Sequence, residues 1–232
     1  MCRTGEQVLP SGNLLHLGHG KLIAHACSFV SFSPNIQNIE ALAHLVAEDK
    51  LAMPSQLLVR LHPNHFMDVK RFAAEREAIR RLAKELPHVH VVEPVPLGGS
   101  LGYYSGEDMP EKSSMMAYAD IFTTVYSTML VEASIHARPV VSVCIDSPVG
   151  WPGKYTLPLS KIGGWPTHSR FLQSGSGKLA QNEIQLSEIL NHYLEQPDAN
   201  INEQHNFIEC ECTFTDGSAG KRTGEYLLSL LQ

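Results

Sequence analysis

The 232-residue sequence lacks several features that would place it in a specialised class of proteins. No apolar run reaches the roughly 18 residues of a membrane-spanning helix, and the amino terminus lacks the apolar core of a signal peptide. Basic residues are not in excess, because the formal net charge is -6 and no basic stripe stands out. These absences exclude a transmembrane segment and argue against a nucleic-acid partner.

Cysteine is scarce and irregularly spaced. The five cysteines are an odd number, and Cys27 and Cys144 fall within apparent buried strands, which suits reduced thiols. Cys210 and Cys212 would share one face of a predicted strand at residues 207–214, but no second Cys or His pair stands at zinc-site spacing around them. We therefore expect no metal site. We also expect a cytoplasmic protein, either free or attached peripherally to the inner face of the membrane.

The stretch from residue 119 to 145 predicts a strand, a helix and a second strand. Residues 121–125 are β-branched and aromatic, and residues 129–137 carry apolar side chains at helical spacing. A further strand at 140–145 begins directly after a proline, which the first residue of a strand tolerates. Two strands joined by a helix are parallel, and a parallel sheet is covered on both faces.

Most of the remaining chain shows the same alternation of short apolar runs and amphipathic segments. Further strands are predicted at residues 25–32, 56–61 and 89–92, and helices at 36–46, 66–86, 111–118, 185–196 and 220–231. The hydrophobic content of 43% is enough for one sizeable core. We therefore expect an irregular lead-in at residues 1–24 and a single α/β domain at residues 25–232.

His62 follows the predicted strand at 56–61 and precedes Pro63. The proline favours an extended backbone at His62, so the imidazole is presented at the carboxyl end of the strand, where open α/β sheets bind ligands. An imidazole there can donate to a phosphate oxygen, and its charge adjusts near neutral pH. The alternative is a turn histidine that bonds to the backbone.

Ser127 and Thr128 occupy the turn between the strand and the helix of the 119–145 stretch. Either hydroxyl can cap the helix, and free backbone N–H groups with the helix dipole make such a turn a seat for phosphate. Glu132 stands one turn into the helix. It either favours the helix dipole, as the acid of a capping box, or accepts hydrogen bonds from sugar hydroxyls at the mouth of the sheet.

Three segments together resemble a known family. They are LLVRLHPN (57–64), ADIFTTVYSTMLVEASIHARPVV (119–141) and DGSAGKR (216–222). They resemble the C-terminal nucleotide-binding half of GT-B glycosyltransferases, a Rossmann-like open parallel sheet with helices on both faces. The likeness is strongest to bacterial polymerases that transfer glycerol phosphate from CDP-glycerol and to related surface-polysaccharide transferases.

The resemblance implies a role for each matching residue. His62, Ser127 and Thr128 would hold the diphosphate of the donor, and Glu132 would lie near its ribose or phosphates. Thr128 replaces a serine that is common in the family and keeps the hydroxyl. Further candidates for donor binding are Ser33, Arg60, Asn64, Asp216 and Arg222. For the last two, the alternative is a structural Asp-Gly turn that caps a terminal helix.

The activity implied is transfer of a sugar or glycerol phosphate in surface-polysaccharide biosynthesis. The nucleotide-activated donor, of CDP or UDP type, would be the substrate, with no cofactor, and helix N-termini and side chains would stabilise the leaving group. Nothing before residue 25 is long enough to form the second half of a GT-B enzyme, which supplies acceptor contacts and usually the catalytic base. We therefore assign no catalytic residue, and expect a donor-binding half completed by another chain or a missing N-terminal half.

Two other functions remain open at this point. One is a non-hydrolysing UDP-N-acetylglucosamine 2-epimerase, which shares the architecture and has similar His-Pro-Asn and late Glu motifs. The other is a non-catalytic nucleotide-binding module or subunit, for which an exposed apolar face would mark the place where a partner docks.

Overall fold

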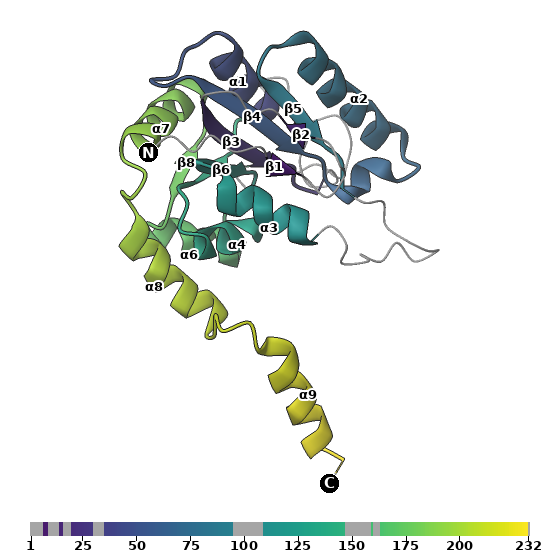
Figure 1. The fold of residues 1–232 in the computed structure, drawn as a ribbon, viewed down its shortest axis with the longest axis vertical. Helices are drawn as coiled ribbons and strands as arrows, with labels where there is room; N and C mark the ends of the chain where they lie inside the picture. The colour runs from purple at the N-terminus through teal and green to yellow at the C-terminus, as the bar shows by residue number, and fades with distance from the viewer. Residues whose placement is uncertain are drawn as a thin grey trace.

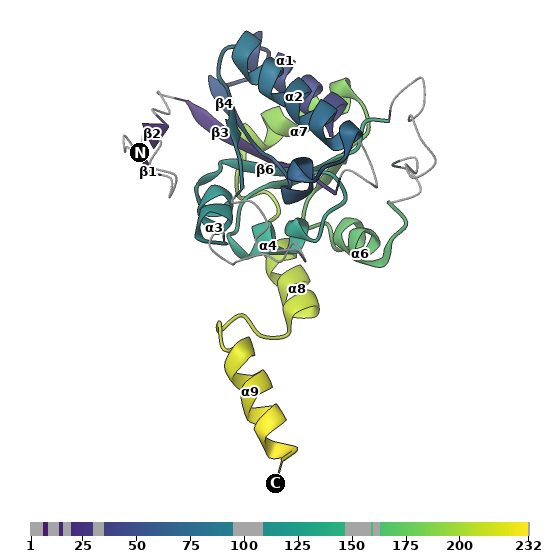
Figure 2. The same cartoon turned by 90° about the vertical axis from the view of Figure 1, so that its right-hand side faces the viewer.

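The structure is a computed structural model that describes residues 7–8, 14–15, 20–29, 35–94, 109–146, 159 and 163–231. Its centre is a six-stranded parallel sheet with helices on both faces (Figures 1 and 2). The strands lie in the order β5 (Val89–Val92), β4 (Ser55–Arg60), β3 (Lys21–Ala26), β6 (Ile121–Thr124), β7 (Val140–Val143) and β8 (Lys178–Ala180). This arrangement confirms the predicted Rossmann-like α/β class. A separate antiparallel pair joins β1 (Gln7–Val8) and β2 (Leu14–Leu15).

The strand order reverses at the central strand. From β3 the chain builds outward to β4 and β5, and then returns to the other side of β3 to add β6, β7 and β8. Such a switch point opens a crevice at the carboxyl ends of the strands. The segments after β4 and β6 therefore flank the same crevice, but β3 lies between them. Strands β4 and β6 are therefore not direct neighbours in the sheet.

Helices cover the sheet in two layers, because each buries an apolar stripe against one face. One layer contains α1 (Ile36–Ala47), α2 (Lys70–Glu85) and α7 (Glu183–Glu195), which pack over Ile23, Leu57 and Val141. The other contains α3 (Met109–Tyr118), α4 (Met129–Ile135), α6 (Pro166–Ser174) and α8 (Ile201–Cys212), which pack over Ala24, Phe122 and Val140.

Several predicted elements differ from the structure. The first core strand begins at Lys21 and ends at Ala26, so it includes residues that were assigned to the lead-in. Helix α2 begins only at Lys70, because Pro63–Phe66 form a 3-10 turn. The predicted strand at 207–214 is wrong, since α8 runs through it and buries Phe207 and Ile208. Helix α6 and strand β8 were not predicted.

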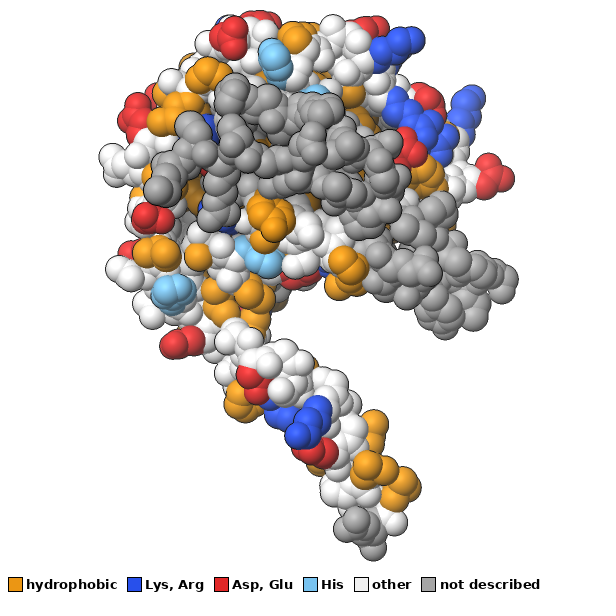
Figure 3. Space-filling view, viewed as in Figure 1, with side chains coloured by type: hydrophobic (Ala, Val, Ile, Leu, Met, Phe, Trp, Pro, Cys, Tyr) orange, Lys and Arg blue, Asp and Glu red, His pale blue; other side chains and the backbone are white. Residues whose placement is uncertain are grey.

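The chain ends in α9 (Ala219–Ser229), which projects away from the body beyond α8 (Figures 1 and 2). None of its residues is buried, and apolar side chains lie along it in the open (Figure 3). They include Tyr226, Leu227, Leu228 and Leu230. Among the helices of the described ranges, none combines the length and hydropathy that crossing a membrane requires.

Candidate functional site

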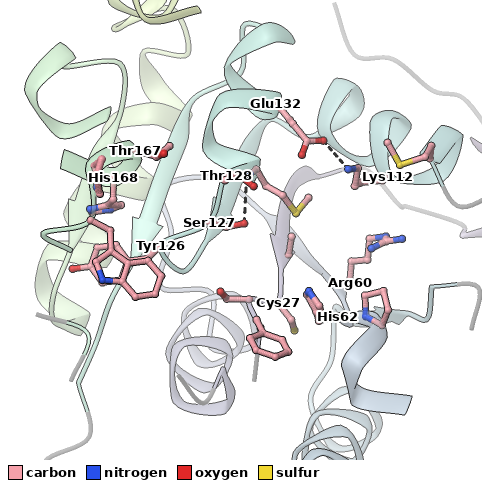
Figure 4. A pocket seen from close by; sticks show the side chains of 18 residues that line it. Cys27, Arg60, His62, Lys112, Tyr126, Ser127, Thr128, Glu132, Thr167 and His168 are labelled. Atoms are coloured by element: carbon pink, nitrogen blue, oxygen red, sulfur yellow. Dashed lines mark hydrogen bonds and ion pairs between the residues drawn. The ribbon is translucent and has the colours of Figure 1, made fainter. Parts of the chain in front are cut away.

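A pocket of about 660 Å³ lies at the switch point of the sheet (Figure 4). Its wall is built from the ends of β3 and β4, from α3, from the turn before α4 and from the start of α6. The lining residues are Ala26, Cys27, Ser28, Phe29, Arg60, His62, Pro63, Met109, Lys112, Tyr126, Ser127, Thr128, Met129, Glu132, Trp165, Pro166, Thr167 and His168.

His62 is both a turn histidine and a pocket residue. Its backbone is extended, with φ -77° and ψ 141°, as the following Pro63 predicted. Its Nδ1 accepts the backbone N–H of Asn64 at 3.1 Å, so the neutral ring carries its proton on Nε2. Burial, reinforced by the nearby His65 and Arg60, lowers the pKa of His62 to about 4. At pH 7 His62 is thus a neutral donor, and the expectation that its charge adjusts near neutral pH is wrong.

The turn before α4 presents hydroxyls to the pocket but few free N–H groups. Ser127 Oγ accepts the N–H of Met129 at 3.2 Å, and the N–H groups of Leu130 and Val131 donate to the carbonyls of Ser127 and Thr128. Ser127 therefore caps the turn, whereas the Thr128 side chain makes no capping hydrogen bond. The expected supply of free N–H donors is largely used within the turn. The two hydroxyls remain the polar groups that this turn offers a ligand.

Two ion pairs lie at the charged side of the pocket. Lys112 Nζ of α3 pairs with Glu132 Oε2 of α4 at 2.7 Å across the mouth (Figure 4). Glu132 therefore does not close a capping box. It could accept hydrogen bonds from sugar hydroxyls only after its pair with Lys112 opens. Deeper in the wall, buried Arg60 Nε lies 3.5 Å from Glu111 Oε1. The charges of the two cations are thus balanced by two glutamates.

The opposite side of the pocket is aromatic. Tyr126 has a positive φ of 34°, a conformation that costs energy for a non-glycine residue and is often found at functional sites. Its ring lies edge-on to His168, with centroids 3.8 Å apart. A Cβ at Gly163 would stand 2.6 Å from the Tyr126 hydroxyl oxygen, so a larger residue there would force the Tyr126 ring to shift. Trp165 is 42% exposed and lines the same side of the pocket.

His168 does not offer a nitrogen to the pocket. Its Nδ1–H donates to the Gly163 carbonyl at 3.2 Å, and its Nε2 accepts the hydroxyl of buried Ser142 at 3.0 Å. Burial lowers the pKa of His168 to about 4. Since both ring nitrogens are occupied, this side chain supports the wall and is not placed to act as a base.

The structure brings some of the predicted residues together and separates others. Arg60, His62, Ser127, Thr128 and Glu132 all line the pocket. Asn64 contributes through its backbone N–H, which orients His62. Asp216 and Arg222 pair with each other at 2.8 Å, on the chain that leads from α8 into α9 and away from the pocket. Ser33 lies outside the described residues.

Candidate metal ligands do not cluster in the described ranges. These ranges contain no group of three or more His, Cys, Asp or Glu residues that could hold an ion. Cys210 and Cys212 lie on a helix, with Cys210 exposed. Cys27 lines the pocket, but burial raises the pKa of its thiol, so it is not an activated nucleophile.

The sequence did not point to Lys112, Tyr126 or His168 as pocket residues. Lys112 is one charged residue in a helix, and only the packing of α3 against α4 turns it to the pocket. His168 lies in α6, which was not predicted. Tyr126 directly precedes Ser127 at the end of a predicted strand, and this position was the feature of the sequence that could have identified it as a pocket residue.

Neither a scan against family models nor a search of curated proteins finds a match to this sequence. Solved structures do show a likeness. The structure of S. aureus MnaA with UDP is 15% identical with a TM-score of 0.50, over 91% of this chain and 46% of that one. The chain has a GT-B-like α/β fold.

Two further structures illustrate the range of such neighbours. One is the UDP-GlcNAc 2-epimerase from Neisseria meningitidis bound to UDP-GlcNAc, at 15% identity and a TM-score of 0.49, over 92% of this chain and 45% of that one. The other is the wall teichoic acid polymerase TagF soaked with CDPG. It is 13% identical with a TM-score of 0.46, over 90% of this chain and 41% of that one. The chain spans less than half the length of each of these proteins.

Proposed function

We propose that the chain binds the diphosphate of a nucleotide-activated sugar or polyol in the pocket at its switch point. The observation that carries this proposal is that His62 and the Ser127–Thr128 turn, which follow β4 and β6, line one pocket. In this proposal the His62 Nε2–H and the two hydroxyls donate to phosphate oxygens. Glu132 accepts from the ribose hydroxyls once a ligand displaces it from Lys112, which then turns to the phosphates.

The proposed activity is transfer of a sugar or glycerol phosphate from the donor, with this chain as the donor-binding half. The resemblance of its sequence motifs to polymerases that use CDP-glycerol prompts this proposal. The described residues of the pocket supply donors for a leaving diphosphate but no placed base, because His62 is capped by Asn64 and His168 is bonded on both sides. The acceptor and its base belong to a second half, or to a partner chain.

A second candidate is a UDP-N-acetylglucosamine 2-epimerase. The MnaA structure, which was solved with UDP, supports a donor of UDP type, as this candidate uses. An epimerase converts the free donor without an acceptor, so incubation with UDP-N-acetylglucosamine alone separates it from a transferase. Product appearing without any acceptor would support the epimerase.

The third candidate, a nucleotide-binding subunit without its own chemistry, differs from both by turning over nothing. The exposed apolar side chains of α9 are the kind of surface that it requires. Mixing with a purified second half and measuring donor consumption separates it from the transferase, since a subunit without chemistry restores no turnover.

Thermal or chemical unfolding with nucleotides tests the binding proposal directly. At a hundredfold excess over the dissociation constant, UDP or CDP should raise the free energy of unfolding by about 2.7 kcal/mol. His62→Ala should weaken the affinity several-fold, because a neutral hydrogen bond contributes about 0.5–1.5 kcal/mol. The matched control is His205→Ala, an exposed histidine on α8. No nucleotide-dependent shift in the wild type, across UDP, CDP and their sugar derivatives, would refute the proposal.

A second pair of variants tests the turn. Ser127→Ala removes a hydroxyl from the pocket, and Ser187→Ala removes one from α7, far along the chain from it. We expect only the first to weaken nucleotide binding. Equal affinities for the two variants would show that the turn does not contact the ligand.

A further inference from the structure

The side chain that organises one wall of the pocket lies outside it. Glu75 of α2 is buried, and burying an ionised carboxylate is costly unless donors surround it. Its Oε1 accepts the backbone N–H of Asn35 and, at 3.1 Å, that of Ile36. Its Oε2 accepts Nδ2 of Asn35 at 3.3 Å and Nε2–H of His65 at 2.9 Å. The carboxylate therefore connects two separate segments, the start of α1 and the 3-10 turn after β4.

The first connection runs through His65 to His62. The His65 ring is completely buried, and because its Nε2–H donates to Glu75, its Nδ1 is left as an acceptor in the neutral ring. That Nδ1 accepts the backbone N–H of His62 at 3.0 Å. Glu75 thus sets the tautomer of His65, and His65 in turn holds the backbone of His62.

The second connection runs through Asn35 to the ring of His62. Asn35 Oδ1 accepts the N–H of Ser28 at 2.7 Å, and its Nδ2 donates to the Ser28 carbonyl at 3.2 Å. The next residue, Phe29, places its ring centroid 5.8 Å from that of His62. Ser28, Phe29 and His62 all line the pocket. The contacts therefore close a circuit that begins and ends at Glu75.

We propose that Glu75 is a positioning residue for the pocket, which acts through His65 and Asn35 to fix the direction of the His62 Nε2–H. Side chains that contact a ligand are precise only when surrounding hydrogen bonds lock their rotamers. The identity of the ligand, a nucleoside diphosphate derivative, rests on the proposed function. The coupling of Glu75 to His62 does not, because it can be measured in the protein without ligand.

Glu75→Gln gives a specific expected outcome. An amide that keeps its oxygen towards the two N–H groups of α1 must turn its NH₂ towards His65, where it meets Nε2–H donor against donor. The His65 ring then takes the other tautomer, so its Nδ1–H donates to the His62 carbonyl, 3.1 Å away, and the His62 N–H loses its acceptor. The exposed neighbour Glu77→Gln, on the same helix, is the matched control.

The readouts are the nitrogen-15 spectrum of the histidine rings, the exchange rate of the His62 amide and the dissociation constant for UDP. We expect Glu75→Gln to move the His65 proton from Nε2 to Nδ1, to accelerate exchange of the His62 amide, and to weaken UDP binding about tenfold, with Glu77→Gln unchanged. A folded Glu75→Gln protein with the wild-type His65 tautomer, or with wild-type affinity for UDP, would overturn the proposal.

Measuring the wild type first distinguishes failure of the Glu75–His62 coupling from failure of the proposed function. If Glu75→Gln does not fold, the wild-type spectrum still decides, because His65 protonated on Nδ1 in the wild type would itself overturn the circuit, and protonation on Nε2 with a protected His62 amide would support it. If the wild type shows the expected tautomer but binds no nucleotide, the proposed function fails while the coupling stands.

Discussion

The protonation state of His62 leads to a quantitative prediction for ligand binding. With a pKa of about 4, roughly one molecule in a thousand carries the charge at pH 7. UDP-glucose is a suitable ligand, because each phosphate of its disubstituted diphosphate carries a single strongly acidic group and does not titrate near neutrality. We expect its dissociation constant to stay within about twofold between pH 8 and pH 6, even if the bound diphosphate raises the pKa of His62 by a unit or more.

A histidine with the ordinary pKa of about 6.5 would behave differently. It would gain a charge across this range, and its pairing with the diphosphate would strengthen binding about tenfold as the pH falls from 8 to 6. Isothermal titration calorimetry at several pH values separates the two cases. His62→Gln is an informative variant, because its amide keeps a neutral donor and should retain most of the affinity. A tenfold gain in the wild type that disappears in His62→Gln would refute the neutral-donor reasoning.

Three further predictions concern the ion pair, the core and the packing of the sheet. Glu132→Gln should weaken UDP binding, because the ribose hydroxyls lose a charged acceptor, but strengthen pyrophosphate binding, because Lys112 is freed from its 2.7 Å pair. Calorimetry with both ligands measures the two affinities, and a change of both in the same direction would contradict this prediction. Burial lowers the pKa of His25 to about 3, so below pH 6.5 the unfolded chain binds a proton that the folded chain does not. The free energy of unfolding should therefore fall by about 1.4 kcal/mol per pH unit below 6.5. Urea unfolding at pH 7 and pH 5 measures this fall, which should be smaller in His25→Asn. Gly177→Ala should cost about 1–3 kcal/mol, because a Cβ there would overlap a phenylalanine ring and a carbonyl, whereas Gly220→Ala, in open space, should not; equal unfolding midpoints would contradict this.

The fold could be predicted where local pattern and tertiary packing agree. The strand Val89–Val92 and the helix over 36–46 were found nearly to the residue, since their apolar positions face the core in the structure as well. Helix α8 was missed because few of its residues favour a helix and its apolar positions are sparse. It is held by packing, with the ring of Phe207 5.8 Å from that of Phe171, which no local pattern shows.

Helix α6 was missed although its sequence carries a recognisable signal. Pro166 occupies the first helical position, and Gly175 follows the last residue with a left-handed φ of 72°. Proline at the start and glycine after the end of a segment are typical of a helix. The prolines and glycines on both sides of this segment are also typical of irregular connections, and they obscure that signal.

Some of the predicted site residues lie together in the structure, for a physical reason. Residues directly after parallel strands are placed by the topology, so His62 and Ser127 could be assigned to one edge of the sheet from the sequence alone. The partners that tune them could not, because Lys112 and Glu75 reach the site through helix packing. Asp216 and Arg222 matched a motif but satisfy each other at a distance from the pocket.

The charge balance of the pocket indicates how a diphosphate would be held. Arg60 and Lys112 are each already paired with a glutamate, so two added negative charges find no uncommitted cation among the described lining residues. Binding must then depend on Lys112 changing partner and on neutral donors, the His62 Nε2–H and the hydroxyls of the turn. Neutral hydrogen bonds are weaker than charge-assisted ones, and any hydrogen bond weakens steeply when it is misaligned. The direction of the His62 ring, set from Glu75, therefore matters more to this site than the charge of the ring.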